Sequence, residues 1–133
     1  MTAVIDKVAW ICIRDQRVLV ARSRGKELYY LPGGKRESGE SDTDTLVREV
    51  AEELSVRIKR ETVSYIGVFT AEANGKADGI QVKMSCYSAE YEGELQAAAE
   101  IEEWAWFSYD ERDRVSEVSR VILEKLHELE LLS

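Results

Sequence analysis

The spacing of apolar residues predicts two helices separated by several short strands. Between residues 42 and 54 the apolar side chains recur at helical spacing, so that about 100° per residue places them on one side. A second amphipathic helix is expected from about residue 116 to residue 131. Strands are expected where short segments are apolar or alternate, at residues 8–14, 17–22, 28–31, 56–58, 63–70, 80–91 and 104–109.

Turn-forming residues punctuate these segments. Asp15 and Gln16 are expected to join the first two strands, and Asn74-Gly75 and Asp78-Gly79 predict a flexible hairpin connection before residue 80. The first helix is expected to begin near Ser41 or Asp42, with Ser41 and Asp44 offering oxygen atoms to free backbone amides. Mixed strands with two helices indicate an α/β sandwich in which a sheet lies between helices.

Length and charge narrow the class of protein. The chain has 133 residues, which predicts one domain spanning residues 1–133. A net charge of -8 argues against a nucleic acid polymer as a partner, because such a partner requires a basic surface. Since no long apolar run or secretory signal is visible, no membrane association is expected and a cytoplasmic location is the default. Cys12 and Cys86 lie in apolar segments and are expected to be buried free thiols.

The first predicted helix carries an unusual concentration of carboxylates. Glu49, Glu52 and Glu53 share an arc beside the apolar stripe, and like charges three or four residues apart destabilise an isolated helix. A bound cation removes that cost. Because carboxylate oxygens are preferred by hard divalent ions, the cluster indicates Mg²⁺ or Mn²⁺. Glutamate-rich helices are nevertheless common on solvent-exposed faces, so the surrounding residues must distinguish the two interpretations.

Those residues match a known motif. From Gly34 to Val56 the chain resembles the Nudix box, Gly-x5-Glu-x7-Arg-Glu-U-x-Glu-Glu-x-Gly-U, where U is aliphatic. The motif begins directly after Pro32 and Gly33 and departs from the pattern only at Ser55, which replaces a glycine at the helix end. A non-glycine residue there commonly costs about 1 kcal/mol, so the departure is expected to affect stability and not the site.

Resemblance to the Nudix hydrolases implies a fold and a reaction. The fold would be the Nudix α/β/α sandwich with a mixed sheet. The reaction would be metal-dependent attack of water on phosphorus in a nucleoside diphosphate linked to another group. In this family the metal ligands commonly include the carbonyl before the box glycine and the box glutamates, which here implies Gly33, Glu49, Glu52 and Glu53. Arg48 and Glu40 would orient that set, and the catalytic residues would include Arg48 with the three glutamates.

The resemblance also implies contributions from outside the box. Nudix proteins often use a further carboxylate from a loop ahead of a Trp-Phe pair, which here favours Glu100 as a metal ligand and catalytic residue. Glu102 and Glu103 remain competitors, and the whole segment could be a solvated acidic turn. Arg22 and Lys35 are candidate phosphate contacts, although either could be an ordinary surface charge.

The substrate is less closely defined by the sequence. Subfamily marks downstream of the box are absent, and by elimination the chain looks MutT-like, which favours a nucleoside triphosphate or a modified nucleotide. A nucleotide-binding or sensing domain with little turnover is the alternative. Five aromatic residues could stack on a base, although core packing is the more common role of aromatics in strands: Trp10, Tyr29, Tyr30, Tyr87 and Trp104.

The oligomeric state is open between a monomer and a homodimer. The terminal helix carries an apolar stripe that includes Val118, Val121, Ile122, Leu126 and Leu129. This stripe could form a dimer interface, but packing against the core of the same chain is the favoured interpretation. His127, the single histidine, has no partner at ligand spacing and is assigned no role.

Overall fold

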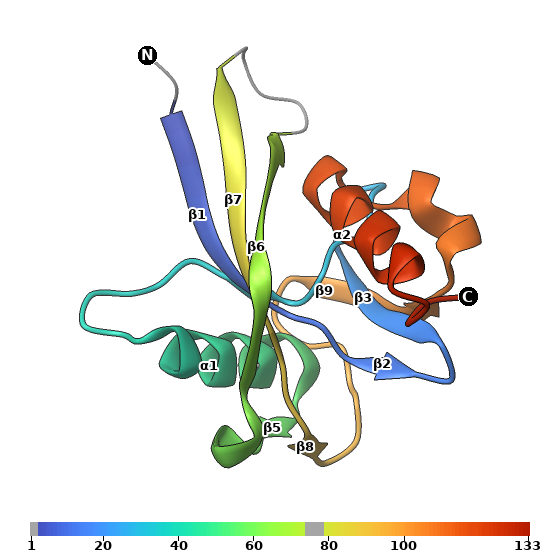
Figure 1. The fold of residues 1–133 in the computed structure, drawn as a ribbon. Helices are drawn as coiled ribbons and strands as arrows, with labels where there is room; N and C mark the ends of the chain where they lie inside the picture. Colours follow the sequence, from blue (N-terminus) through green and yellow to red (C-terminus); the bar gives the residue numbers. More distant parts are fainter. Residues whose placement is uncertain (1–2, 74–78) are drawn as a thin grey trace.

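The computed structural model describes residues 3–73 and 79–133, which form two α-helices, two 3₁₀ helices and nine strands (Figure 1). The order along the chain is β1 (Ala3–Trp10), β2 (Ile13–Arg14), β3 (Arg17–Ser23), β4 (Gly33–Gly34), α1 (Asp42–Leu54), β5 (Arg57–Ile58), η1 (Arg60–Thr62), β6 (Ser64–Glu72), β7 (Ile80–Ser88), β8 (Tyr91–Glu92), β9 (Ile101–Phe107), η2 (Tyr109–Arg114) and α2 (Glu117–Glu128).

The largest sheet is mixed, as predicted. Its strand order is β4-β1-β7-β6, in which β1 and β7 are parallel and the other two pairs are antiparallel. A second, antiparallel sheet has the order β2-β3-β9, and β5 pairs with β8. The long crossover between β1 and β7 carries α1, so the first helix is held against the sheet that the crossover joins.

Two hydrophobic cores lie on opposite faces of the sheets. On β1, Val8 and Trp10 pack with α1, whereas Ala9 packs in the cluster that includes α2 residues. On β3, Leu19 faces the α1 cluster and Val20 faces the α2 cluster. Because successive strand residues point to opposite faces, both strands are buried on both sides. The layers are therefore helix, sheet, helix, with α1 and α2 on either side (Figure 1).

The structure divides two segments that the sequence predicted as continuous strands. The first begins earlier than expected, at Ala3, and ends at Trp10, because the chain leaves β7 there and pairs with β3 from Ile13 onward. The expected strand 80–91 likewise ends at Ser88, and Tyr91 then pairs with β5. Side-chain alternation continues across such a change of partner, so the apolar pattern does not reveal it.

Other boundaries also differ from the prediction. Residues 28–31 form only isolated bridges, and the short strand β4 lies at the glycine pair instead. Strand β9 begins at Ile101, three residues before the expected position 104, which removes Glu102 and Glu103 from the predicted loop. The two 3₁₀ helices were not predicted. The expected turn residues 74–75 and 78 lie outside the described residues, whereas the turn at Asp15 and Gln16 is confirmed.

Helix α1 begins as the sequence predicted. Ser41 is its N-cap and accepts a hydrogen bond from the Asp44 backbone amide, while the Asp44 carboxylate accepts one from the Ser41 amide. At the other end Ser55 has φ of 64°, a left-handed conformation that glycine adopts without strain. The site-bearing helix is therefore well capped at its start and strained at its end.

Replacing Ser55 with glycine is expected to raise the free energy of unfolding by about 0.5–1 kcal/mol, because glycine relieves the left-handed strain. Urea denaturation of the two proteins measures the change. The control is Ala51→Gly on the exposed side of the same helix, which is expected to lower the stability by about 1 kcal/mol. A loss of stability in Ser55→Gly would mean that the serine side chain supports this helix end.

The terminal helix packs against the core. Val118, Ile122 and Leu126 are at most 4% exposed, whereas Leu129 lies beyond the helix and is 51% exposed. Val118 is therefore not available to a partner subunit in this fold. Cys12 and Cys86 are free and buried, as predicted. Within the described part of the chain, no helix has the length and apolar character needed to span a bilayer.

Candidate active site

A cleft of about 720 Å³ lies where the carboxylate edge of α1 meets the glycine pair of β4. It brings together six residues that the sequence analysis singled out, which come from three separate parts of the chain: Gly33, Gly34, Lys35, Glu49, Glu53 and Glu100. Arg22, Arg48 and Glu52, also predicted from the sequence, do not line it. The fold thus assembles most of the predicted site from distant segments.

Glu53 is the most deeply buried carboxylate of the cleft. It is 3% exposed, and its Oε1 accepts a hydrogen bond of 3.0 Å from the Gly33 backbone amide. The pKa of Glu53 is raised to about 8, mainly by burial and also by the charges of Glu49 and Glu100, against the opposing effect of the Gly33 amide. A buried carboxylate facing two others is costly unless a positive charge joins it.

Both glycines of β4 are required by close contacts. A Cβ on Gly33 would lie 2.0 Å from the Val8 carbonyl oxygen, and the φ of Gly33 is 146°, which side-chain-bearing residues rarely adopt. A Cβ on Gly34 would lie 2.6–2.8 Å from the carboxylate atoms of Glu49. The first glycine allows β4 to approach β1, and the second leaves room for the Glu49 carboxylate.

Arg48 ties the helix to the preceding loop. Its Nε donates to Glu40 at 2.7 Å, Nη1 donates to Glu49 Oε1 at 2.7 Å, and Nη2 donates to the Lys35 carbonyl at 3.0 Å. These hydrogen bonds hold the pKa of Glu40 down at about 2, with Arg48 as the main cause. The contacts are of the kind expected for a residue that positions Glu49, and a role of Arg48 in catalysis stays a prediction.

The three helix glutamates occupy different environments. The Glu49 side chain is 17% exposed and its pKa is raised, mainly by burial, whereas the Glu52 side chain is 54% exposed and lies 3.5 Å from Arg48. Among the residues that the structure describes, no three acidic, thiol or imidazole groups form a preassembled metal site. The oxygen donors of Glu49, Glu53 and Glu100 nevertheless suit a hard divalent cation, since a cation would relieve their mutual repulsion.

Glu100 is separated from its two competitors by the start of β9. It lines the cleft, whereas Glu102 and Glu103 belong to the strand and do not. Arg22 Nη1 lies 2.7 Å from Glu102, and Arg22 Nη2 lies 3.5 Å from Glu103. Arg22 is thus ion-paired outside the cleft, and its predicted contact with phosphate stays untested.

Of the five aromatic candidates for base stacking, only Tyr30 lines the cleft. Trp10 and Tyr29 are at most 5% exposed. Trp104 and Tyr87 pack against the α1 core, and the Tyr87 hydroxyl donates to Asp42. Burial and the Ser23 hydrogen bond have opposite effects on the Tyr30 phenol, and the net result is a pKa of about 12. Tyr30 is therefore neutral at physiological pH.

The structure adds cleft residues that sequence reasoning missed. Lys7 and Lys26 line the cleft together with the predicted Lys35. Lys26 lies in a polar loop and carried no signal. Lys7 did carry one, because it is the single cation of the largely apolar strand β1 and directly precedes the buried residues Val8, Ala9 and Trp10.

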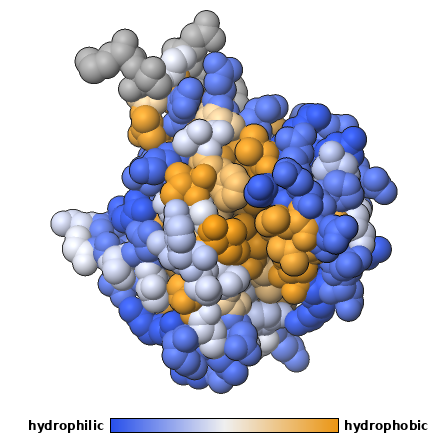
Figure 2. All heavy atoms as spheres, in the orientation of Figure 1, coloured by the Kyte–Doolittle hydropathy of each residue, from blue (hydrophilic) through white to orange (hydrophobic). Residues whose placement is uncertain are grey.

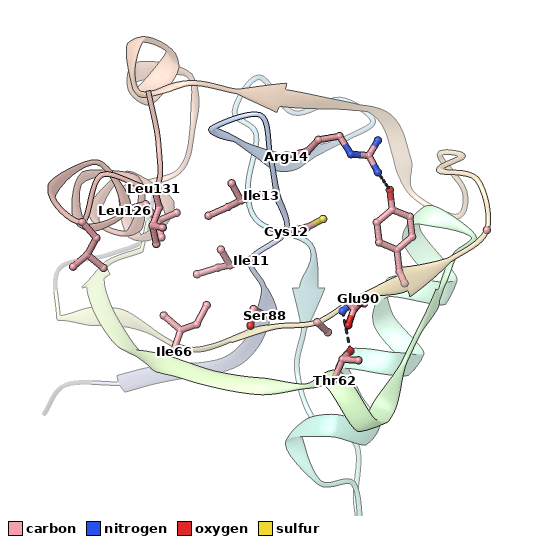
Figure 3. Close-up of a pocket in the computed structure, with 14 residues that line it drawn as sticks. Ile11, Cys12, Ile13, Arg14, Thr62, Ile66, Ser88, Glu90, Leu126 and Leu131 are labelled. Carbon is pink, nitrogen blue, oxygen red and sulfur yellow. Dashed lines mark hydrogen bonds between the residues drawn. The ribbon is translucent and has the colours of Figure 1, made fainter.

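A second cavity, of about 890 Å³, has a different character. Figure 3 shows Ile11, Ile13 and Ile66 gathered beside the end of α2, with Arg14 on the far side bonded to Tyr91 at 2.8 Å. Figure 2 shows the face of the molecule that carries β6, and apolar side chains gather in the middle of that face. Of the carboxylate residues in the described part of the chain, only Glu90 lines this cavity, so it does not contain the acidic cluster.

Comparisons with known proteins agree with this geometry. The model of the NUDIX domain family matches residues 5–126. The solution structure of the E. coli ORF135 protein is 28% identical, with a TM-score of 0.76, and the match covers 97% of this chain and 92% of that one. The mutator MutT protein of Bacillus halodurans is 25% identical, with a TM-score of 0.69 and coverages of 90% and 80%.

A third solved structure, the MutT NUDIX hydrolase of Burkholderia pseudomallei, shares the fold at 24% identity, with a TM-score of 0.74 and coverages of 92% and 98%. No curated protein matches the chain. Nudix hydrolases act on nucleoside diphosphate derivatives and generally use divalent cations. The family match extends over nearly all of the residues that build the cleft, from β1 to α2. The chain therefore belongs to the Nudix family and is a Nudix pyrophosphohydrolase.

Proposed function

We propose that this enzyme hydrolyses a nucleoside triphosphate or a modified nucleotide, with Mg²⁺ or Mn²⁺ as its cofactor, and that residues 1–133 act as a single Nudix domain. The observation that carries the proposal is the buried Glu53, which shares one cleft with Glu49 and Glu100. Three carboxylates are retained there although burial and mutual repulsion raise the pKa of two of them. Such a cost is typical of a catalytic site.

The proposed roles follow from position. Glu49, Glu53, Glu100 and the backbone of Gly33 would hold the metal, which when bound supplies charge neutralisation and activation of water. Glu53 is held in place by the Gly33 amide, and Arg48 holds Glu49. Glu52 lies outside the cleft, and its predicted role as ligand and catalytic residue would require its side chain to turn toward Glu49. Lys35 would contact the phosphate chain at the mouth.

The rest of the cleft supports a small nucleotide as substrate. Beyond the carboxylates, its wall is apolar and includes Leu28, Leu31, Val82 and Met84, with Tyr30 beside them. Small-molecule sites commonly combine such a wall with a few placed polar groups. A base could rest against this wall while its phosphates extend to the carboxylates. The proposed oligomeric state is a monomer or a homodimer, and no membrane or nucleic acid polymer is proposed as a partner.

A substrate panel tests the proposal. We expect purified protein to hydrolyse at least one nucleoside triphosphate, modified nucleotide or nucleoside diphosphate derivative with Mg²⁺ or Mn²⁺, and to lose that activity when chelator is added. Products separated by ion-exchange chromatography identify the cleaved bond, and ¹⁸O-labelled water identifies the attacked phosphorus. A folded protein that binds nucleotides but hydrolyses none of them would favour the alternative, a binding or sensing domain.

A further inference from the structure

The cleft must bind a polyanion although its own lining is predominantly acidic. Among the residues that the structure describes, five glutamates and three lysines line it: Glu27, Glu49, Glu53, Glu72 and Glu100 with Lys7, Lys26 and Lys35. A phosphate chain entering this lining meets net repulsion unless cations lie along its path. The positions of the lysines therefore decide where the phosphates can rest.

Lys7 differs from the other two cleft lysines in its position in the fold. Lys26 and Lys35 are exposed residues of loops, whereas Lys7 is partly buried and lies within β1. Its neighbours in the sheet are fixed, because Lys7 pairs with Met84 of β7 and Val8 pairs with Gly34 of β4. A side chain on a strand that is hydrogen-bonded into a sheet has a defined origin and direction, so less freedom is lost when it binds a ligand.

The register also brings two positive charges together. The antiparallel pair ends where Val8 lies opposite Gly34, and the residues next to this last pair, Lys7 and Lys35, both line the same cleft. Like charges that line one cleft repel each other. An anion between the two ammonium groups would remove that cost.

Three arginines of the described residues near the site are held in ion pairs. Arg22 is paired with Glu102, Arg36 with Asp42 and Arg48 with Glu40. The positive charge of Lys7 acts on the cleft, since it lowers the pKa of Glu53 against the larger effect of burial. Lys7 is thus within electrostatic reach of the buried carboxylate beside which the reaction is proposed.

We propose that Lys7 is a substrate-binding residue that holds the phosphate chain beside Glu53, together with Lys35, and that it favours nucleoside triphosphates over substrates with fewer phosphate charges. This assignment rests on the proposed function, since it presupposes that a nucleotide enters the cleft. To that function it adds a specific contact between the substrate and a side chain of strand β1. The selectivity follows because a second ammonium group gains more from a longer, more highly charged phosphate chain.

The test compares four proteins: the wild type, Lys7→Met, Lys7→Arg and Lys83→Met. Lys83 is a matched control because it pairs with Asp6, the residue next to Lys7 in β1, and therefore lies on the opposite face of the same sheet outside the cleft. Calorimetry measures the binding of a nucleoside triphosphate analogue with a non-hydrolysable methylene bridge, with and without Mg²⁺. Kinetics with the best substrate of the panel give KM and kcat.

Lys7→Met is expected to raise both the Kd of the analogue and the KM about tenfold, while kcat changes less than about twofold, because a charged hydrogen bond to phosphate is lost. The loss should be smaller for the corresponding monophosphate, and the salt dependence of binding should weaken. Lys7→Arg should restore most of the affinity, and Lys83→Met should bind like the wild type.

An unchanged Kd in folded Lys7→Met would overturn the assignment, as would a fall in kcat at constant KM, which would indicate an effect on the catalytic carboxylates alone. If Lys7→Met does not fold, as judged by near-UV circular dichroism, Lys7→Gln replaces it. Failure of both to fold would make Lys7 a structural residue and also overturn the assignment. A wild-type protein that neither binds nor hydrolyses any nucleotide contradicts the proposed function itself, which separates the two failures.

Discussion

Substituting Gln for Glu53 is expected to lower the rate of nucleotide hydrolysis by a factor of about 10² to 10⁴, the range typical of a lost acid-base group. The glutamine keeps the size of the side chain and an oxygen that can accept the hydrogen bond from the Gly33 amide. It removes the negative charge that the cleft presents to a cation. Initial rates at saturating substrate and Mg²⁺ measure the change.

Glu61→Gln, at an exposed position in η1, is the matched control and is expected to keep wild-type activity. Equal activity of Glu53→Gln and the wild type would remove Glu53 from the mechanism. The control also shows whether the loss of one acidic charge anywhere on the protein affects catalysis.

The same substitution has a predicted effect on stability that does not depend on turnover. The pKa of Glu53 rises from an ordinary value of 4.5 to about 8 in the fold, so the folded state favours the protonated carboxyl. Its contribution is fully present below pH 4.5 and is lost as the pH rises to 8. Without metal, Glu53→Gln should therefore be more stable than the wild type at pH 8, by up to about 5 kcal/mol, since each unit corresponds to about 1.4 kcal/mol.

Urea denaturation with chelator at pH 4.5 and pH 8 measures this difference, which should be small at the lower pH. Adding Mg²⁺ at pH 8 should narrow it, because a cation at the carboxylates stabilises only the wild type. A stability difference that is the same at both pH values would contradict the raised pKa of Glu53. A difference that Mg²⁺ leaves unchanged would contradict the proposed metal position.

The second large effect is expected when either of the adjacent glycines Gly33 and Gly34 is replaced by alanine. One replacement should reduce stability and the other should reduce activity. Gly33→Ala is expected to lose at least about 3 kcal/mol of stability, because the added Cβ meets the Val8 carbonyl at 2.0 Å and the backbone conformation is strained. Gly34→Ala is expected to fold. The three atoms nearest to its Cβ all belong to the Glu49 carboxylate, at the far end of a side chain, so this carboxylate must move and hydrolysis should fall about a hundredfold.

Thermal unfolding and initial rates together distinguish the two outcomes. Gly39→Ala serves as a control, since its φ of 83° carries similar strain but nothing lies within 4 Å of the added Cβ. We expect it to lose about 1 kcal/mol of stability and to retain activity. A fully active Gly34→Ala would mean that the position of Glu49 is not critical to the reaction.

The local features of the chain were predictable because they depend on residues close together in sequence. The start of α1, its Ser41 and Asp44 capping box and its buried stripe follow from helical spacing and cap chemistry. The turn at Asp15 and Gln16 is of the same kind. The predicted ends of β1, β7 and β9 were wrong because each depends on the strand that lies alongside. A change of partner ends β1 and β7, and pairing with β3 extends β9 back to Ile101, and neither leaves a mark in the side-chain pattern.

The candidate site divides along the same line. The sequence by itself determined the family, the acidic helix edge and the glycine pair, since one motif of fixed spacing contains the glycine turn and the carboxylates of the helix that follows it. Only the tertiary structure decided which groups face the cleft: it buries Glu53, leaves Glu52 outside, and separates Glu100 from Glu102. Lys7 joins them through β1, far from the box in sequence, because strand register and burial are set by contacts between distant segments.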